Sequence, residues 1–268
     1  MLRSSLSSLG DLAELISDRP FLTLLSREVR RFMRVWMQTI VPPLLTSLLY
    51  VVVFGVALGS RIETLEGVPY LTYIVPGIAF MSLITGANSN SSSSVFDAKR
   101  ERYIDEVLVS PMSDLQIALA YVLGGTLRGV IIGTGIFLVC LPFVEITVQH
   151  PLLLFVIGIL SAFIFSSVGT IVGVLATRVD HISFLTNVVI QPLTFLGGVF
   201  YSVNMLPDGL RIVTLFNPVF YIVDAARFAA LEASDLNPYP TLVMIVVFCV
   251  LSITGAWWSI HRGPTLRY

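Results

Sequence analysis

Six apolar stretches, each about as long as a helix needs to be to cross a bilayer, run through this sequence. They lie at roughly 38–60, 70–94, 115–140, 151–177, 183–203 and 237–260. A spanning helix needs about 20 predominantly apolar residues. Charged residues make up 12% of the chain, whereas a soluble domain carries about 25%. The sequence therefore predicts an all-α membrane protein with six transmembrane helices.

The positive charges are sorted along the chain. With the N-terminus in the cytoplasm, the inner segments hold twelve of the 16 Lys and Arg residues, and the outer segments hold only Arg61, Arg211 and Arg227. Cytoplasmic segments carry this excess in membrane proteins. The first twenty residues include acidic side chains and no continuous apolar core, so we expect no cleavable signal there. Both termini are expected in the cytoplasm.

The stretch from Phe195 to Phe228 is apolar enough for lipid but is broken by glycine and proline. Non-helical backbone at membrane depth must be shielded by protein or line a cavity. We expect the fifth spanning helix to end near Tyr201 and short re-entrant helices to follow, closing or lining a pathway. The candidate pathway or gate residues are Phe195, Gly197, Gly198, Phe200, Tyr201, Asn217 and Pro218, together with Arg128 inside the third span. Arg128 could instead have a structural partner or snorkel to the interface.

An amphipathic helix is predicted at 20–37. Apolar residues follow one side of it, Pro20 suits a first helical position, and the other side is basic, with Arg27, Arg30, Arg31 and Arg34. This pattern is typical of a helix lying in the membrane interface, its apolar face in the acyl boundary and its cations at anionic head groups. A basic leader that only sets topology would show the same charges.

The loop between the second and third spans is the most charged part of the chain. It reads FDAKRERYIDEVLVSPMSD over 96–114. Arg102 and Glu106 stand four apart and could support a short helix, which Pro111 would end. Such a helix could dock on a soluble partner, or the loop could be a solvated hairpin. Before it, the serine-rich run 88–94 predicts close helix packing through small residues, although a flexible polar end is the alternative.

Several kinds of chemistry are missing from the sequence. Lys99 is the only lysine, and it does not stand in the G-x-x-x-x-G-K-[ST] pattern that holds nucleotide phosphates. We expect no catalytic residue, no metal site and no nucleic-acid partner. Cys140 and Cys249 lie in apolar runs and are expected to be small buried side chains. Energy for transport would have to come from another chain.

Three motifs resemble those of ABC-2 type transporter permeases, most of all the bacterial YadH-type branch, with the NodJ and daunorubicin-type exporter permeases further off. They are RFMRVWMQTIVPPLLTSLLYVVVFG at 31–55, ERYIDEVLVSPMS at 101–113, and FLGGVFYSVNMLPDGLRIVTLFNPVFYIVDAARF at 195–228. The resemblance runs from about residue 20 to the end of the chain, and it does not specify a substrate.

The resemblance implies a type V exporter-like fold and a set of partners. The working unit would be a homodimer of this permease with two copies of an ABC ATPase, which would bind the ATP and Mg²⁺; this chain would hold no cofactor. It would lie in the bacterial inner membrane and export a lipid, polysaccharide or amphipathic drug. The implied coupling helix would touch the ATPase through Lys99, Arg100, Glu101, Arg102, Tyr103, Ile104, Asp105, Glu106 and Val107. Among these, Tyr103, Ile104 and Val107 would form an apolar plug.

The expected organisation then follows. It comprises an N-terminal extension (1–19), the interfacial helix (20–37), a transmembrane domain (38–260) with a coupling helix (97–109) and a re-entrant region (204–235), and a cytoplasmic tail (261–268). A partner-independent carrier or channel, an intramembrane lipid enzyme and a membrane scaffold are the alternatives. A carrier needs acidic or His relays within its spans, an enzyme needs a nucleophile beside an activating group, and a scaffold requires neither the charged loop nor the broken stretch.

Overall fold

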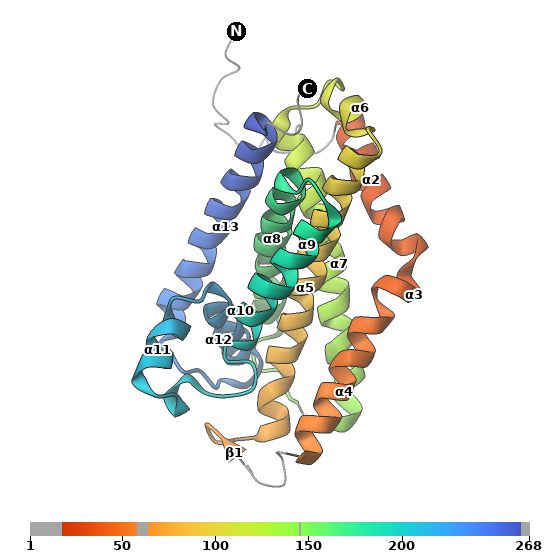
Figure 1. Cartoon of the computed structure of the whole chain (residues 1–268). Helices are drawn as coiled ribbons and strands as arrows, with labels where there is room; N and C mark the ends of the chain where they lie inside the picture. The colour runs from red at the N-terminus through yellow and green to blue at the C-terminus, as the bar shows by residue number, and fades with distance from the viewer. Residues whose placement is uncertain (1–17, 58–63, 145, 264–268) are drawn as a thin grey trace.

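The computed structural model describes residues 18–57, 64–144 and 146–263 and shows a bundle of long helices (Figure 1). The long helices are α4 (Val41–Ala57), α5 (Tyr70–Arg100), α7 (Asp114–Cys140), α8 (Pro151–Leu175) and α13 (Pro238–Arg262). The shorter ones are α2 (Arg19–Arg34), α3 (Trp36–Thr39), α6 (Ile104–Leu108), α9 (Val179–Leu185), α10 (Gln191–Phe195), α11 (Asp208–Leu215) and α12 (Pro218–Leu231). Three single turns, η1 (Leu141–Phe143), η2 (Thr186–Ile190) and η3 (Val203–Met205), and the antiparallel strands β1 (Thr64–Leu65) and β2 (Val68–Pro69) complete the described chain.

The fold class is confirmed as an all-α membrane protein. Within the described residues, five helices are long and apolar enough to cross a bilayer. The helices α11 and α12 form a pair bent by 88° that would count as a sixth span if taken together. Four of the predicted spans match α5, α7, α8 and α13 closely, and the first matches α4, with residues 58–60 outside the described part of the chain.

The predicted fifth span, 183–203, differs most from the structure. The helical stretch there runs through α9, the π turn η2 and α10, and it ends at Phe195 rather than near Tyr201. It is not among the five long helices. The chain turns after Phe195, and Gly198 has a positive φ of +74°, a conformation that glycine adopts without a steric penalty. The region of the expected re-entrant helices contains the bent pair α11 and α12, whose 88° bend is compatible with a re-entrant element or with a broken span.

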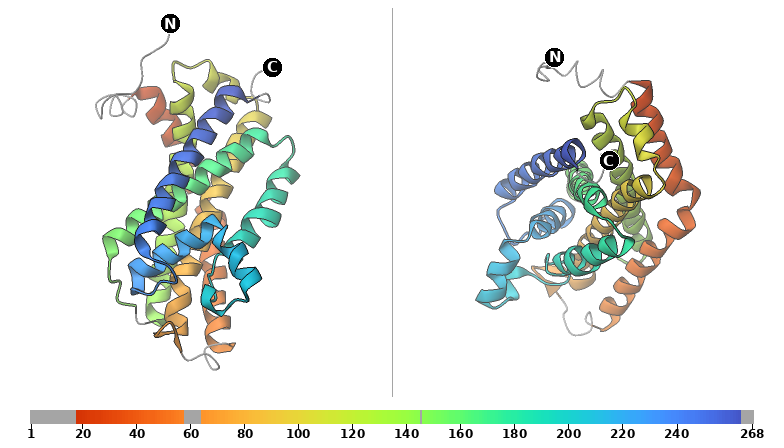
Figure 2. Two further views of the ribbon diagram at one scale, coloured as in Figure 1. Left: turned by 90° about the vertical axis from the view of Figure 1, so that its left-hand side faces the viewer. Right: turned by 45° about the horizontal axis from the view of Figure 1, so that its top comes forward.

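The two ends of the bundle differ. One end, called here the α6 end, holds the start of α2, α6 and the start of α7; the other, the hairpin end, holds β1, β2 and α11 (Figures 1 and 2). At the α6 end, His261 Nδ1 of α13 lies 2.6 Å from Asp114 Oδ2 of α7. Among the described residues, the Lys and Arg side chains that the sequence assigns to inner segments belong to elements that meet at the α6 end. Arg211 and Arg227, which it assigns to outer segments, belong to helices of the hairpin end.

The helix α5 is the centre of the bundle and packs against α7 and α8. Small residues permit this approach. A Cβ atom built on Gly129 of α7 would lie 2.8 Å from Ala87 Cβ of α5, and one built on Gly173 of α8 would lie 2.7 Å from the Ser92 carbonyl oxygen. Ser91, Ser92 and Ser94 are fully buried. The predicted role of the serine-rich run in packing is therefore confirmed, since small residues let helix backbones come close.

The amphipathic helix is present as α2, but its apolar side is covered differently from the expectation. Phe21, Leu24 and Phe32 are buried, and Phe21 and Leu24 belong to a cluster that includes Ile117 and Tyr121 of α7. This part of the apolar face therefore packs on protein, whereas Met33 and Trp36, which follow in the sequence, are exposed. The helix ends at Arg34, and α3 follows the break at Val35. Of the expected extension 1–19, residues 1–17 lie outside the described residues, as do 264–268 of the expected tail.

The contact between α5 and α7 yields the first prediction. Replacing Gly129 with Ala should lower the thermal stability of the purified protein, because the new methyl group meets Ala87 and the Leu83 carbonyl oxygen at 2.8 Å. Overpacking of this kind costs about 1–3 kcal/mol. The control is Gly209→Ala in α11, where an added Cβ meets nothing within 4 Å. Equal melting temperatures for the two variants would contradict the proposed role of this contact.

Candidate functional site

The loop between α5 and α7 is anchored by the chain's own core. Ile104 and Val107 of α6 are buried in a cluster with Phe21 and Leu24 of α2. This differs from the expected apolar plug, because two of its three side chains are already buried within the chain's own apolar cluster and cannot reach a partner. Their role in the structure is to fix α6 to the bundle.

The polar residues of the same loop are on the surface. Glu101, Arg102, Asp105 and Glu106 are exposed, and Val109 beside them is 85% exposed. The predicted helix over 97–109 is divided, since α5 continues to Arg100 and α6 begins at Ile104. Arg102 lies between them with a positive φ of 61°, so the expected helical pair of Arg102 and Glu106 does not form. The result is an exposed surface with three carboxylates on a fixed base.

Lys99 and Arg100 point in different directions from the end of α5. Lys99 Nζ donates hydrogen bonds to the carbonyl oxygens of Val174 and Ala176, the latter at 2.9 Å, and so caps the end of α8. A cation is favourable at the C-terminal end of a helix. Arg100 is exposed and lies 3.2 Å from Asp97 and 3.3 Å from Glu101. Of the two, Arg100 is at the surface that a partner could reach.

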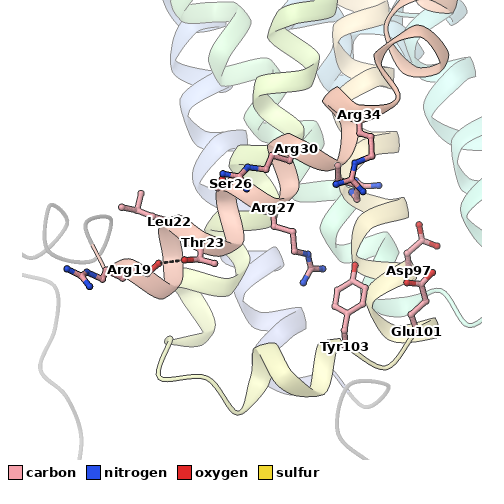
Figure 3. A pocket seen from close by; sticks show the side chains of 11 residues that line it. Arg19, Leu22, Thr23, Ser26, Arg27, Arg30, Arg34, Asp97, Glu101 and Tyr103 are labelled. Carbon is pink, nitrogen blue, oxygen red and sulfur yellow. Dashed lines mark hydrogen bonds between the residues drawn. The ribbon is translucent and has the colours of Figure 1, made fainter.

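The basic side of α2 faces the end of α5 and the loop that follows (Figure 3). The Arg27 guanidinium carbon lies 3.9 Å from the centre of the Tyr103 ring, a cation–π contact. Burial raises the pKa of the Tyr103 phenol, so this ring stays neutral near pH 7. Arg30 and Arg34 are exposed and have no hydrogen-bond or ion-pair partner among the described residues.

Glu28 and Arg31 connect α2 to α5. Glu28 is fully buried, and its Oε2 accepts a hydrogen bond from the Ser94 hydroxyl. Arg31 Nε lies 3.5 Å from the same oxygen. Arg31 also donates to the Asn90 carbonyl oxygen at 2.9 Å. The approach is possible because a Cβ on Gly124 would lie 2.8 Å from Glu28 Cβ. A buried carboxylate needs such partners, so this arginine holds α2 in place.

Arg128 has a hydrogen-bond partner within the chain, as one of the alternatives to pathway lining predicts. Its Nη2 donates a hydrogen bond of 3.1 Å to the carbonyl oxygen of Thr39, the last residue of α3. The carbonyl groups at a helix end lack partners within the helix. Arg128 therefore stabilises the break between α3 and α4.

Asn217 and Pro218 form the start of α12. Asn217 Oδ1 accepts a hydrogen bond from the Val219 amide at 3.0 Å, and Asn217 Nδ2 donates one of 2.6 Å to the Leu193 carbonyl oxygen of α10. Pro218 stands at the first helical position, where its missing amide hydrogen costs nothing. Asn217 and Pro218 therefore start a new helix at the bend after α11, and Asn217 joins α12 to α10.

The other gate candidates lie around the turn after α10. A Cβ on Gly197 would lie 2.8 Å from Val219 Cγ1, so this glycine lets the turn approach α12. The Phe200 ring stacks on Phe54 of α4 with 4.5 Å between the ring centres, and on Phe195 with 5.7 Å. Tyr201 is half-buried next to this aromatic cluster. The cluster joins α4 to α10 at the hairpin end.

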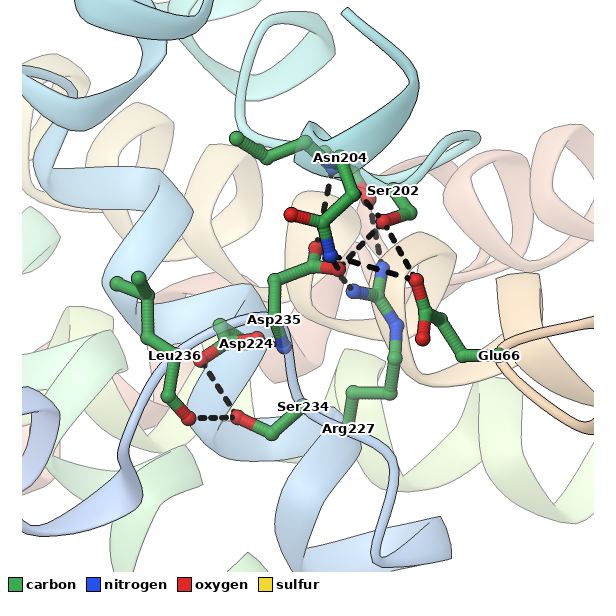
Figure 4. A network of polar contacts seen from close by, with 10 residues as sticks. Glu66, Ser202, Asn204, Asp224, Arg227, Ser234, Asp235 and Leu236 are labelled. Carbon is green, nitrogen blue, oxygen red and sulfur yellow. Dashed lines mark hydrogen bonds and ion pairs between the residues drawn. The ribbon is translucent and has the colours of Figure 1, made fainter.

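A network of polar side chains, called here the polar lock, holds the same region together (Figure 4). Its centre is Arg227 of α12, whose side chain is 1% exposed. Arg227 Nη2 donates a 2.6 Å hydrogen bond to the Gly198 carbonyl oxygen, and its guanidinium carbon lies 3.8 Å from the centre of the Tyr73 ring of α5. Arg227 Nη1 lies 3.8 Å from Asp235, whose side chain is also 1% exposed.

The carboxylates of the polar lock are saturated by other groups. Asp235 accepts hydrogen bonds from Ser202 and from the Val203 amide, the latter at 3.2 Å. Asp224 accepts from Ser234 at 2.9 Å and from the Asp235 amide at 2.7 Å. Glu66 of the hairpin loop reaches Ser202 at 3.0 Å. Sequence reasoning assigned Arg227 to an outer segment and did not find these partners, which come from four separate parts of the chain.

The described residues include no group of three or more His, Cys, Asp or Glu side chains that could hold a metal ion. The described features instead form two assemblies. At the α6 end, exposed charges stand on a fixed base beside a basic helix. At the hairpin end, a broken apolar region is fixed by aromatic stacking and by the polar lock.

Comparison with known proteins identifies similar sequences. A family model described as ABC-2 type transporter matches residues 19–231. The chain is 40% identical over 242 residues to the inner membrane transport permease YadH of Escherichia coli (strain K12), covering 90% of this chain and 94% of that protein. It is 25% identical over 195 residues to nodulation protein J of Rhizobium meliloti (strain 1021), covering 72% of this chain and 74% of that protein.

The polar lock yields the second prediction. Replacing Asp235 with Ala should destabilise the protein by about 3–5 kcal/mol, because it leaves the buried Arg227 charge without its ion-pair partner. The measurement is the thermal unfolding of the purified protein in detergent. The control is His150→Gln, which removes an exposed contact between His150 Nε2 and Glu232. Even exposed ion pairs contribute only about 0–1 kcal/mol. A loss for Asp235→Ala no larger than that of the control would show that Arg227 is held by its other contacts.

Proposed function

Because the chain belongs to the ABC-2 type transporter family and is therefore a transport permease, a membrane subunit of an ABC transporter, we propose that it works as a homodimer driven by two copies of a separate ATPase. The ATPase binds ATP and Mg²⁺, and this chain binds neither. The transported molecule is proposed to be a lipid, a polysaccharide or an amphipathic drug-like compound, moved outward.

The observation that carries the proposal is the exposed charged surface of the α5–α6 loop. Glu101, Asp105 and Glu106 are exposed, while Ile104 and Val107 anchor the same segment in the core. Such a surface can transmit a force to the transmembrane helices, because its anchoring residues pack into an apolar cluster with α2, α5 and α7 and because it directly follows α5. Interface charges fix orientation and partner choice. We propose that the ATPase contacts this loop through these charges.

The chain is a membrane protein of the bacterial inner membrane, as its relative is named. For orientation, we propose that the α6 end is cytoplasmic. The support is the sorting of Lys and Arg, which gathers on elements of that end, since cytoplasmic segments carry an excess of these residues. The hairpin end, with α11 and α12, then closes the pathway on the outer side.

The dimer is proposed to form across exposed apolar faces of the bundle. The exposed large apolar side chains on α4, η2 and α10 are Leu45, Leu49, Val52, Val53, Val188, Val189 and Phe195. The aromatic cluster of Phe54, Phe195 and Phe200 joins these two faces at the hairpin end. A second copy placed here would put the turn after α10 of both protomers along one pathway. This arrangement makes Phe195 and Gly198 the proposed gate.

A partner-independent carrier is the alternative that the buried acidic residues could favour. Of these, Asp224 and Asp235 accept hydrogen bonds from serine hydroxyls and backbone amides within the polar lock. A proton relay needs carboxylates that exchange protons with a pathway. The hydrogen bonds fix the carboxylates of Asp224 and Asp235 in place, which favours a structural role for both residues.

ATP hydrolysis tests the proposal. This chain would be co-expressed and co-purified with a candidate ABC ATPase from the same organism, placed in lipid nanodiscs, and assayed with and without lipids and amphipathic drugs. Hydrolysis that depends on this chain and is stimulated by one class of compound would support coupling and narrow the cargo. Failure of the two chains to co-purify would count against the ABC mechanism and would favour a partner-independent carrier.

The third prediction concerns the loop charges. The double variant Asp105→Lys with Glu106→Lys should reduce ATPase stimulation by about tenfold or more, since both side chains are exposed and the reversal places like charges at the proposed contact. Neither residue has a buried side chain, so folding should be unchanged. Glu232→Lys, an exposed position at the hairpin end, serves as the control. Full stimulation of the double variant would rule out this loop as the docking surface.

A further inference from the structure

A cleft of about 970 Å³ lies between α2 and the junction of α5 with α6 (Figure 3). It is called here the arginine pocket. Its lining consists of Arg19, Leu22, Thr23, Ser26, Arg27, Arg30, Arg31, Arg34, Asp97, Glu101 and Tyr103. Five of these eleven residues are arginines, and all five come from α2. The volume is near the upper end of the range of small-molecule sites, about 300–1,000 Å³.

The positive charge of the pocket is only partly balanced. Arg31 is paired with the buried Glu28, and Arg27 stacks on Tyr103. In contrast, Arg30 and Arg34 have no hydrogen-bond or ion-pair partner among the residues that the structure describes. Their planar forks are therefore available for an oxyanion, which guanidinium groups bind with paired hydrogen bonds.

The two carboxylates of the lining balance only part of the charge of its five arginines. Asp97 and Glu101 also both lie beside Arg100, at 3.2 Å and 3.3 Å. Because Arg100 does not line the pocket, it offsets part of their charge from outside. The repulsion among arginines on one short helix remains, and an anion that entered the cleft would relieve it.

The surroundings of the pocket favour an amphiphile over a free anion. The helix α2 leads directly into the membrane-spanning stretch that begins at Trp36. Met33, Trp36 and Met37, which lie near Arg34 in the sequence, have exposed apolar side chains, and tryptophan is typical of the membrane–water interface. A head group in the pocket would place its acyl chains along these three residues.

We propose that the arginine pocket binds the phosphate-bearing head group of an anionic lipid at the membrane surface, with Arg30 and Arg34 as the principal phosphate ligands. Arg27 and Arg31, which are already held by Tyr103 and by Glu28 and Asn90, form a fixed cationic wall behind the phosphate. The inference requires neither the ATPase nor a direction of transport. Its test is therefore independent of the proposed function.

Native mass spectrometry of the purified full-length chain tests the site. The protein would be titrated with phosphatidic acid, which presents a phosphate monoester, and with phosphatidylcholine, whose head group is neutral overall. We expect one saturable phosphatidic acid site per chain. The double variant Arg30→Gln with Arg34→Gln should weaken it about 30-fold, because each surface cation contributes about 1 kcal/mol to anionic lipid binding.

The matched control removes the same charge at the same end of the bundle. Arg178→Gln with Arg262→Gln replaces two exposed arginines that do not line the pocket, and it should leave binding unchanged. Arg30→Lys with Arg34→Lys keeps the charge and should restore part of the affinity, which separates lost ligands from lost folding. An equal loss of phosphatidic acid affinity in both glutamine double variants would overturn the proposal. It would indicate that the lipid binds through diffuse surface charge and not in the arginine pocket.

Two further arms distinguish the source of the phosphate and the class of partner. Inorganic pyrophosphate that displaced phosphatidic acid at equal concentration would overturn the lipid assignment in favour of a soluble anion. Added ATPase that displaced the lipid, and whose own binding depended on Arg30 and Arg34, would identify the pocket as a protein docking surface and would likewise overturn it. Retention of the lipid in both arms is the expected result.

Discussion

The close approach of α5 to α7 and α8 is the contact on which the rest of the structure depends. Gly129 and Gly173 permit it, because any larger residue would meet α5 at less than 3 Å. In lipid, the hydrophobic effect does not draw helices together, so packing of small residues must do so. Once α5 is enclosed, its two ends are fixed. One end presents Tyr73 to the polar lock, and the other leads into the loop that carries α6.

Charge is treated in opposite ways at the two ends of the bundle. At the hairpin end, Arg227 is buried and is held by a carbonyl oxygen, an aromatic ring and Asp235. A buried charge with such partners is costly to disturb, and it fixes one arrangement of the backbone. At the α6 end, Arg30 and Arg34 have no such partners within the described chain. The first end is built for a single conformation, whereas the second is open to binding.

The spans could be predicted because bilayer thickness imposes a length that is visible in the local sequence. The bounds of α7 and α8 follow that rule closely. The apolar residues of α2 and α6 predict that one face of each helix is covered, but they do not identify what covers it. The sequence therefore assigns Ile104 and Val107 to a partner, whereas the structure buries them in a cluster of the chain's own helices. The polar lock could not be predicted, since its contacts join residues as far apart in sequence as Glu66 and Ser202.

The length of α5 has a mechanical consequence. Its 31 residues form one helix, about 46 Å long at 1.5 Å per residue, which exceeds the hydrocarbon thickness of about 30 Å. Glycines of α7 and α8 hold this helix over several turns, from Leu83 beside Gly133 to Val95 beside Gly173. A helix enclosed over such a length moves together with its neighbours instead of bending. The loop after Arg100 and the Tyr73 ring that contacts Arg227 are therefore the two ends of one stiff element.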